Sequence, residues 1–512
     1  MAPENGSPTK RAGAAPLVVC AAGAALLAQA VALATLPVVF VNDSSAYLEQ
    51  THGMAAPEVR GAAAAQEAPS DRDILYPPGY PLFLDLCRLP AGRGGWMLTT
   101  VLAQHVLSFL SVLLVASIGA AAGRPRTGAV AALLYALYLP RVIYAQAILS
   151  ETLFTFLLLA AIRFFPSARV SGSRRTAAAL GAALGAALLV KPVAGILLVV
   201  LAAALALDPG TPRGRRSALL CLAAAAGLAA GALAHNAAVY GKWRLTTCVG
   251  RHLADRVFRL DRLVDRGDPA TREVLERLES SGRPYKFPHF WWNYWHALRK
   301  DGSSIERDDA LLLRAAWAGI ASDPAAYARN TLKGLRLVVR SPWQEIVPGR
   351  FFLDREAYAN YLTYGYRPPP DQSYLWPGIY TGHRAAVRAL DLYPPPLLLG
   401  KFGSWWFRFF GAKEWRWRGR AGAGLLVAGC LAGLVLAGGN GLRTAVAGAG
   451  ATLVAVTLLE YPFPRYFEPF MPLALVLWTA GAAAAYERVR SLGRSSRSSA
   501  GSPSVGGNRR LP

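Results

Sequence analysis

The stretch APLVVCAAGAALLAQAVALATLPVVFV, residues 15–41, contains no charged residue and decides the fold class. A helix of about 20 apolar residues is long enough to cross the hydrocarbon core of a bilayer. This stretch is apolar on all sides, as a helix surrounded by lipid must be. It follows Lys10 and Arg11 and is far longer than the apolar core of a cleaved signal peptide. We therefore interpret it as a retained first membrane span.

Similar apolar runs recur along the 512 residues, of which 53% are hydrophobic and only 17% are charged. They predict an all-α polytopic membrane protein with about ten transmembrane helices, because soluble domains would show amphipathic periodicity. The aromatic stretch at 405–410 is a further candidate for entering the lipid, which changes this count by one or two. The GxxxG spacing of Gly181 and Gly185 predicts close helix packing. Beyond the first span, the expected spans cover residues 97–122, 128–144, 147–165, 176–190, 193–207, 217–240, 421–437, 443–460 and 467–486.

Arginine residues are concentrated in alternate connections between these spans, for example at Arg124 and Arg126 and again at Arg213 and Arg215. Because cytoplasmic loops collect Lys and Arg, both termini are expected in the cytoplasm, with the longest loops on the periplasmic or exterior side of the cytoplasmic (inner) membrane. The expected parts are a cytoplasmic N-terminus 1–14, a membrane domain 15–240 whose external catalytic loop 42–96 forms juxtamembrane helices, an external lobe 241–420, spans within 421–486, and a disordered basic tail 487–512.

The formal charge of +24 does not indicate a nucleic-acid partner, because the basic residues lie mainly in the connections and no nucleic-acid-reading motif is present. Walker loops, HExxH and nucleophile elbows are absent from the sequence, which argues against nucleotide-driven transport and zinc hydrolysis. The five cysteines form no CxxC pair. Cys87 and Cys248 both fall on the expected outer side, and whether they pair stays open.

Two acidic clusters lie at the outer ends of spans. In the first, NDSSAY at 42–47, Asp43 and Tyr47 are four residues apart and would share a helix face. In the second, Glu151 follows Ser150 at the outer end of the fourth span. Each acidic cluster also has a structural interpretation, since Asp43 and Ser150 can cap helices and Glu151 can complement a helix dipole. A carboxylate pair across one cavity would suit acid/base chemistry at a sugar hydroxyl.

A third cluster is cationic and is expected at or beyond the outer boundary. Singly, these residues would reach the interface as ordinary snorkelling side chains, and Lys191-Pro192 would be a simple hairpin turn. Together they would bind a phosphate and stabilise it as a leaving group. The cluster comprises Arg141, Lys191, Arg251, Arg256 and Arg465.

Several of these segments resemble the C-type (GT-C) membrane glycosyltransferases, specifically glycosyltransferase family 39, the group of the protein O-mannosyltransferases and the lipid A aminoarabinose transferase. The resemblance covers the membrane half and the first external loop in family order, whereas the lobe from about 255 to 420 matches loosely. The segments are NDSSAYLEQ at 42–50, YPPGYPLFL at 76–84, AQAILSETLFTFLLL at 145–159, LVKPVAGILL at 189–198, HNAAVYGKWRLTTCVGRHL at 235–253 and PFPRYFEPFMP at 462–472.

The resemblance implies an inverting transfer of a sugar from a polyprenyl-phosphate donor to an acceptor hydroxyl at the outer membrane face. It assigns the role of catalytic base to Asp43, with Glu151 as the second catalytic acidic residue. The sequence shows no spacing typical of metal ligands, and it leaves open whether a divalent cation takes part in the reaction. The residues expected to bind substrate or lipid phosphate are Tyr47, Arg72, Tyr80, Arg141, Lys191, Arg256 and Arg465.

Two other classes of protein stay open. A transporter or flippase of lipid-linked sugars would suit many spans and a basic outer face, although neither paired halves nor ionisable residues at the midplane are evident. A catalytically degenerate scaffold would explain two departures from the family pattern, at His235-Asn236 and Tyr76-Pro77. The residues alone identify neither the sugar, nor the oligomeric state, nor whether the acceptor is a protein, a lipid or a glycan.

Overall fold

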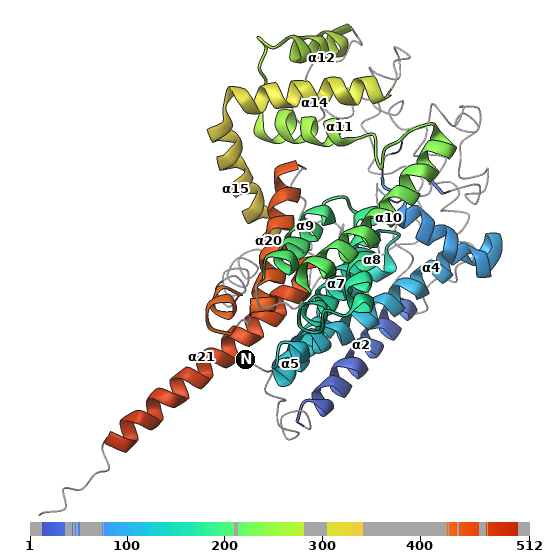
Figure 1. Ribbon diagram of the computed structural model, residues 1–512. Coiled ribbons are helices and arrows are strands. Elements are labelled where there is room, and N and C mark those ends of the chain that lie inside the picture. The colour runs from blue at the N-terminus through green and yellow to red at the C-terminus, as the bar shows by residue number, and fades with distance from the viewer. Residues whose placement is uncertain are drawn as a thin grey trace, which may run out of the picture.

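All regular elements that the computed structural model describes are helices, which confirms the expected all-α class. Figure 1 shows a bundle of long helices with a smaller helical lobe above it. The structure describes residues 13–35, 44, 47, 50–51, 74, 76–208, 213–280, 305–340, 428, 430–437, 440–459, 467 and 469–499.

The helices of the first part of the bundle follow the predicted apolar runs, except that α4 begins at Gly79, inside the predicted external loop, and not at residue 97. Four of its helices are long and apolar enough to cross a membrane, and α5 with α6, bent by 58°, forms a fifth if the pair is one broken span. The expected count of ten is not confirmed in the part of the chain described. The four span-length helices are α2 (Ala15–Thr35), α4 (Gly79–Ala121), α7 (Glu151–Ser171) and α10 (Gly214–Tyr240). The other helices of this part are α5 (Pro125–Ala136), α6 (Leu139–Gln146), α8 (Arg174–Val190) and α9 (Ala194–Leu207).

Helices α8 and α10 pack with their backbones in close approach, as the GxxxG spacing predicted. A methyl group added at Gly181 would lie 2.1 Å from the carbonyl oxygen of Cys221, and one at Gly185 would lie 2.8 Å from the Cα atom of Ala225. Inside a bilayer, apolar contact gives little net driving force between helices, so close packing of small residues holds them together.

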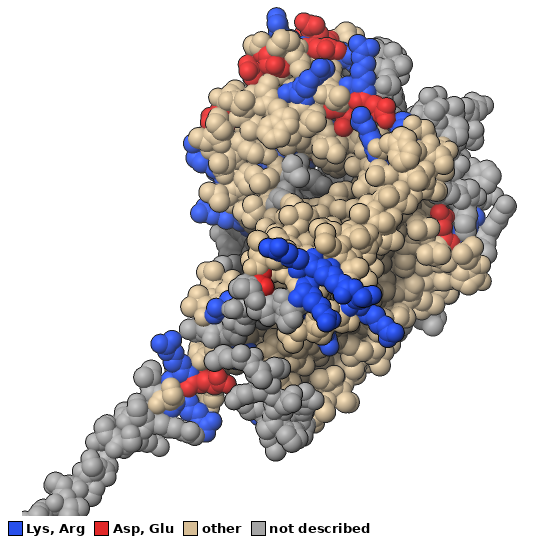
Figure 2. Space-filling view, in the orientation of Figure 1, with Lys and Arg blue, Asp and Glu red and all other residues tan. Residues whose placement is uncertain are grey.

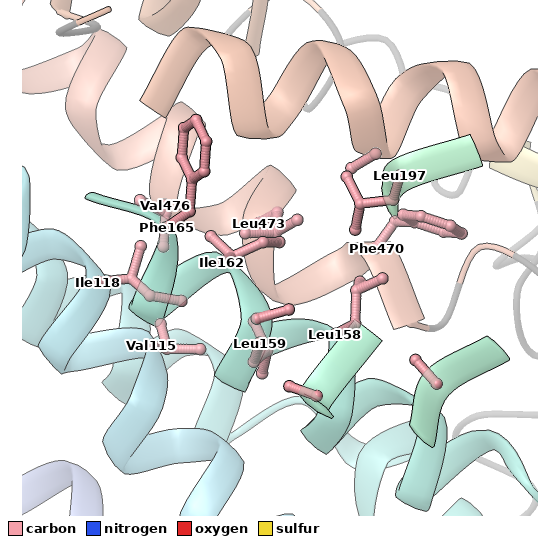
Figure 3. Close-up of a cluster of buried hydrophobic side chains, with 14 of the residues drawn as sticks. Val115, Ile118, Leu158, Leu159, Ile162, Phe165, Leu197, Phe470, Leu473 and Val476 are labelled. Carbon is pink, nitrogen blue, oxygen red and sulfur yellow. The ribbon is translucent and has the colours of Figure 1, made fainter. Parts of the chain in front are cut away.

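Two C-terminal helices, α20 (Asn440–Leu459) and α21 (Met471–Ser499), pack against the earlier part of the bundle. Figure 3 shows Leu473 and Val476 of α21 in one cluster with Ile162 of α7 and Val115 of α4. The two groups of apolar helices, far apart in sequence, therefore form one core.

The lobe contains α11 (Val249–Ala254), the π-helical turn η2 (Asp255–Asp261), α12 (Pro269–Ser280), α14 (Ile305–Ser322) and α15 (Pro324–Arg340). Its own core includes Val257, Phe258, Leu278 and Leu312. Figure 1 shows α12 and α14 farthest from the bundle and α15 running from α14 towards α20. Neither Cys87 nor Cys248 forms a disulfide.

The bundle exposes large apolar side chains, including Val19, Leu27, Leu89 and Leu219. Exposed residues of this kind on long apolar helices are what contact with lipid requires. In Figure 2, Lys and Arg side chains gather near the middle of the visible face, whereas acidic and basic side chains mix over α12 and α14 at the top. The protein is thus a multi-pass membrane protein, and which side faces the cytoplasm stays a prediction.

Candidate functional site

An ion pair joins the ends of two apolar helices. The Nζ atom of Lys191 lies 3.0 Å from Oε1 of Glu151, and the Lys191 side chain is 20% exposed whereas that of Glu151 is 2% exposed. The ammonium also lies 5.8 Å from the centroid of the Phe154 ring. The pair therefore turns its cation, and not its carboxylate, towards solvent.

Local sequence explains why these residues stand at helix ends. Helix α8 stops at Val190 because Lys191 is extended and Pro192 follows, and a proline cannot continue the hydrogen-bond ladder. Helix α7 begins at Glu151, where a carboxylate complements the positive end of the helix dipole. Ser150 precedes Glu151 without capping α7 through its side chain, so the capping interpretation of Ser150 was wrong.

The hydroxyl of Ser150 instead meets the first external loop. It lies 2.9 Å from the hydroxyl of Tyr47, and Ser44 donates a hydrogen bond of 2.8 Å to the carbonyl of Ile148. Two helical residues of the NDSSAYLEQ segment are therefore attached to the segment that leads into Glu151. The two acidic clusters that the sequence presents separately converge in space at these contacts.

Three tyrosines pack beside this junction. The Tyr47 ring lies 4.4 Å from that of Tyr76 and 4.7 Å from that of Tyr80, measured between centroids. The Gln50 side chain donates to the Tyr76 carbonyl at 2.8 Å and accepts from its amide at 2.9 Å. Since the amide side chain of Gln50 satisfies both backbone groups of Tyr76, two distant positions of the external loop are held together.

Gly79 brings the YPPGYPLFL segment against the same place. A methyl group at Gly79 would lie 2.6 Å from the carbonyl of Leu189, so only glycine permits this approach to the end of α8. The next residue, Tyr80, donates to Gln104 at 2.8 Å, and Gln104 donates to the carbonyls of Ala145 and Ala147. Burial, assisted by Tyr47, Glu151 and Cys87, raises the pKa of Tyr80 well above its ordinary value, so Tyr80 serves as a neutral donor.

Arg141 is buried at the bend between α5 and α6. Its guanidinium donates to the hydroxyl of Ser108 at 2.6 Å and to the carbonyls of Tyr135 and Ala136 at 3.2 and 3.0 Å. These carbonyls end α5, and a broken helix at membrane depth needs such donors. Arg141 and Glu151 also line one cavity of about 10 Å³, roughly the room that one water molecule needs.

Arg256 lies elsewhere, where the lobe meets α20. It is fully buried and pairs with Asp261 at 2.9 Å. It also donates to the hydroxyl of Thr331 and the carbonyl of Thr457. The structure therefore does not bring Arg256 to the Glu151–Lys191 pair. Its contacts connect the lobe to a bundle helix.

The remaining predicted site residues, Asp43, Arg72 and Arg465, lie outside the described residues. Sequence reasoning missed Gln50, Gln104, Ser44 and Ser150 as positioning residues, although Gln50, Ser44 and Ser150 stand inside the quoted motifs and Gln104 does not. Within the described parts of the chain, no group of three or more His, Cys, Asp or Glu side chains is placed to hold a metal ion.

No protein-family model matches this chain, and no curated protein matches it. Among solved structures, it is similar to the archaeal oligosaccharyltransferase AglB from Archaeoglobus fulgidus, in complex with an inhibitory peptide and a dolichol-phosphate. The identity is 13% and the TM-score 0.42, over 99% of this chain and 53% of AglB. The present chain thus spans about half the length of that enzyme.

It is also similar to ArnT from Cupriavidus metallidurans bound to undecaprenyl phosphate, at 14% identity and a TM-score of 0.35, over 91% of this chain and 78% of ArnT. Because both TM-scores lie below 0.5, these similarities say nothing about the function of this chain. The resemblance of the motifs at 42–50 and 145–159 implies the donor class and the role of Asp43, and the chain's own contacts place Lys191 beside Glu151.

Proposed function

We propose that this protein is an inverting glycosyltransferase that moves a sugar from a polyprenyl-phosphate donor to an acceptor hydroxyl at the outer membrane face. The supporting observation is the Glu151–Lys191 pair, which presents a cation to solvent at the ends of two apolar helices. The phosphate of a lipid carrier embedded in the bilayer would lie at the same depth as this cation. Since nucleotide sugars are cytoplasmic, a site on the outer side needs a donor that has crossed the membrane already.

Lys191 would bind the donor phosphate. Its ammonium neutralises charge that develops on the phosphate oxygen as the bond to the anomeric carbon breaks. Glu151 would hold that ammonium in place, because its carboxylate is buried against the helix end and the lysine side chain is the longer and more exposed partner. Such positioning contributes to rate by fixing the charge before the reaction begins.

Asp43 would act as the base. It directly precedes Ser44 in the chain, and Ser44 is hydrogen-bonded to the segment that leads to Glu151. In the reaction, the acceptor oxygen bonds to the anomeric carbon while its proton passes to Asp43, and the polyprenyl phosphate leaves with the bonding electron pair. One displacement inverts the anomeric configuration.

The test uses the full-length protein in nanodiscs with polyprenyl-phosphate sugars radiolabelled in the sugar. We expect wild-type protein to release or transfer the label, Asp43→Asn to be inactive while still retaining lipid, and Lys191→Gln to bind donor more weakly. Arg272→Gln, an exposed cation of α12, serves as the matched control and should retain wild-type turnover.

Full turnover by Asp43→Asn would remove that residue from the proposed base role. If wild-type protein turns over none of the donors and instead moves lipid-linked sugar across proteoliposome bilayers, the protein is a flippase and the proposal is overturned.

A further inference from the structure

Helix α15, Pro324–Arg340, has one face that is both cationic and apolar. Arg329, Lys333 and Arg336 are exposed, and their spacing of four and then three residues puts them on the same side of the helix. Leu332, on that side, is 61% exposed. The helix contains no acidic residue, so its exposed face carries charge of one sign.

Contacts hold α15 at the end of a predicted membrane span. The Tyr327 hydroxyl donates to the carbonyl of Leu458, in the last turn of α20. Arg256 contacts Thr331 of α15 and Thr457 of α20 at once. Figure 1 shows α15 meeting α20 and running crosswise to α10. Because α20 is an apolar helix that ends at these contacts, α15 lies where the bilayer surface is expected.

We propose that the Arg329–Lys333–Arg336 face of α15 is a membrane-surface site that binds the phosphates of anionic phospholipids in the outer leaflet. Lys and Arg on an interfacial helix reach up to headgroup phosphates while their aliphatic stems lie on apolar chains. Leu332 would enter the boundary between headgroups and acyl chains, as apolar residues of interfacial helices do. These contacts would hold the lobe against the outer surface of the bilayer.

Helix α12 of the same lobe provides an internal comparison. It is also amphipathic, but its polar side carries Glu273, Glu276 and Glu279 together with Arg272 and Arg277. Figure 1 shows α12 far from the bundle, and Figure 2 shows mixed charges there. An anionic surface would repel these carboxylates. Within the lobe, the single-sign charge of α15 thus occurs on a helix in contact with the end of a predicted span.

The experiment uses full-length protein in vesicles of phosphatidylcholine, with or without phosphatidylglycerol, and an environment-sensitive fluorophore on Leu332→Cys. Nitroxide-labelled lipids serve as quenchers. Glu276→Cys is the matched label on α12, and unsubstituted protein gives the background from the five native cysteines. We expect quenching at position 332 that increases with phosphatidylglycerol and falls about twofold or more when Arg329, Lys333 and Arg336 are all replaced by glutamine.

Quenching no greater at position 332 than at position 276 would overturn the proposal. So would quenching at 332 that is the same with and without phosphatidylglycerol, because phosphate recognition requires dependence on lipid charge. Exchanging two of the cations, as in Arg329→Lys with Lys333→Arg, should preserve the quenching at position 332 if charge is the cause. This readout measures no sugar transfer, so its failure would leave the glycosyltransferase proposal standing, and failure of that proposal would leave this one standing.

Discussion

Lys191 and Glu151, forty residues apart, are joined by an ion pair of 3.0 Å between the residue that follows α8 and the residue that begins α7. The two partners are not equivalent. The carboxylate is enclosed, whereas the ammonium stands at a break between two apolar helices with part of its side chain in solvent. The pair is therefore a fixed cation supported from behind by a buried anion, which is an arrangement suited to binding a phosphate.

This asymmetry predicts unequal effects of the two single substitutions on stability. Lys191→Met leaves the buried Glu151 carboxylate without its cation, and we expect a loss of about 3 kcal/mol in unfolding free energy. Glu151→Gln leaves a lysine that can reach water and should cost less, about 1 kcal/mol. Thermal unfolding in nanodiscs measures both. The double variant should recover part of the loss seen with Lys191→Met, and strictly additive losses would contradict coupling between the two residues.

The close packing of α8 on α10 predicts intolerance at Gly181. Its added methyl group would meet the Cys221 carbonyl at 2.1 Å, whereas one at Gly231 on α10 would meet nothing within 4 Å. Gly181→Ala should therefore destabilise the protein by about 1–3 kcal/mol, and Gly231→Ala should leave stability unchanged or slightly improved. Both are read from thermal unfolding in the same detergent. Equal effects of the two substitutions would show that this helix contact does not limit stability.

The contacts of Arg256 predict that it stabilises the junction between the lobe and α20. Arg256→Met would leave the buried Asp261 carboxylate without its guanidinium, at a cost of about 3–5 kcal/mol. Arg256→Met with Asp261→Leu should regain much of this stability, because both members of a buried pair are then apolar. Donor binding by the double variant decides the role of Arg256: near-normal binding indicates a structural role, and lost binding with restored stability indicates phosphate recognition.

The lobe should become less stable as the pH rises through the mildly acidic range. Burial raises the pKa of Asp309 above its ordinary value of 3.8, although backbone amides of Arg251 and Gly250 oppose this shift. The folded lobe therefore binds more protons than the unfolded lobe above about pH 4, and stability falls with pH in that window. Hydrogen exchange of α14 amides, corrected for intrinsic rates, should show greater protection at pH 4 than at pH 7.

Asp309→Asn should reduce this difference between the two pH values. It should not abolish it, since burial also raises the pKa values of Asp255 and Asp261. Protection that rises from pH 4 to pH 7 in the wild-type protein would contradict the assigned direction.

The class of fold was predictable from the sequence because it depends on local properties. Residues 15–35 are apolar on all sides wherever they lie, and the breaks at Pro192 and Gly241 follow from backbone chemistry. The close packing at Gly181 and Gly185 was predictable for the same reason, since small residues four apart form a groove on one helix. The span count was not confirmed, because α8 with 17 residues and α9 with 14 residues are shorter than a full span. Residues 421–427 and other parts of the later apolar runs also lie outside the described residues.

The partners at the candidate site were not predictable, because pairing depends on distance in space. Lys191 and Arg256 stand in the sequence as similar outer cations. In the folded protein, Lys191 pairs with a buried carboxylate while its own side chain stays partly exposed. Arg256 is instead fully enclosed, together with its partner Asp261, between the lobe and the bundle. Ser150 likewise has the sequence position of a helix cap, yet its hydroxyl contacts Tyr47.

The sequence by itself therefore determined the apolar helices, their ends and the residue types available for chemistry, since each depends on side-chain polarity and backbone conformation within a few neighbouring residues. Only the tertiary structure decided which of those residues meet, which are buried and which face solvent. Tyr47, Ser150, Glu151 and Lys191 come together because three chain segments converge there, and an ion pair or hydrogen bond exists only where folding brings its two partners to about 3 Å.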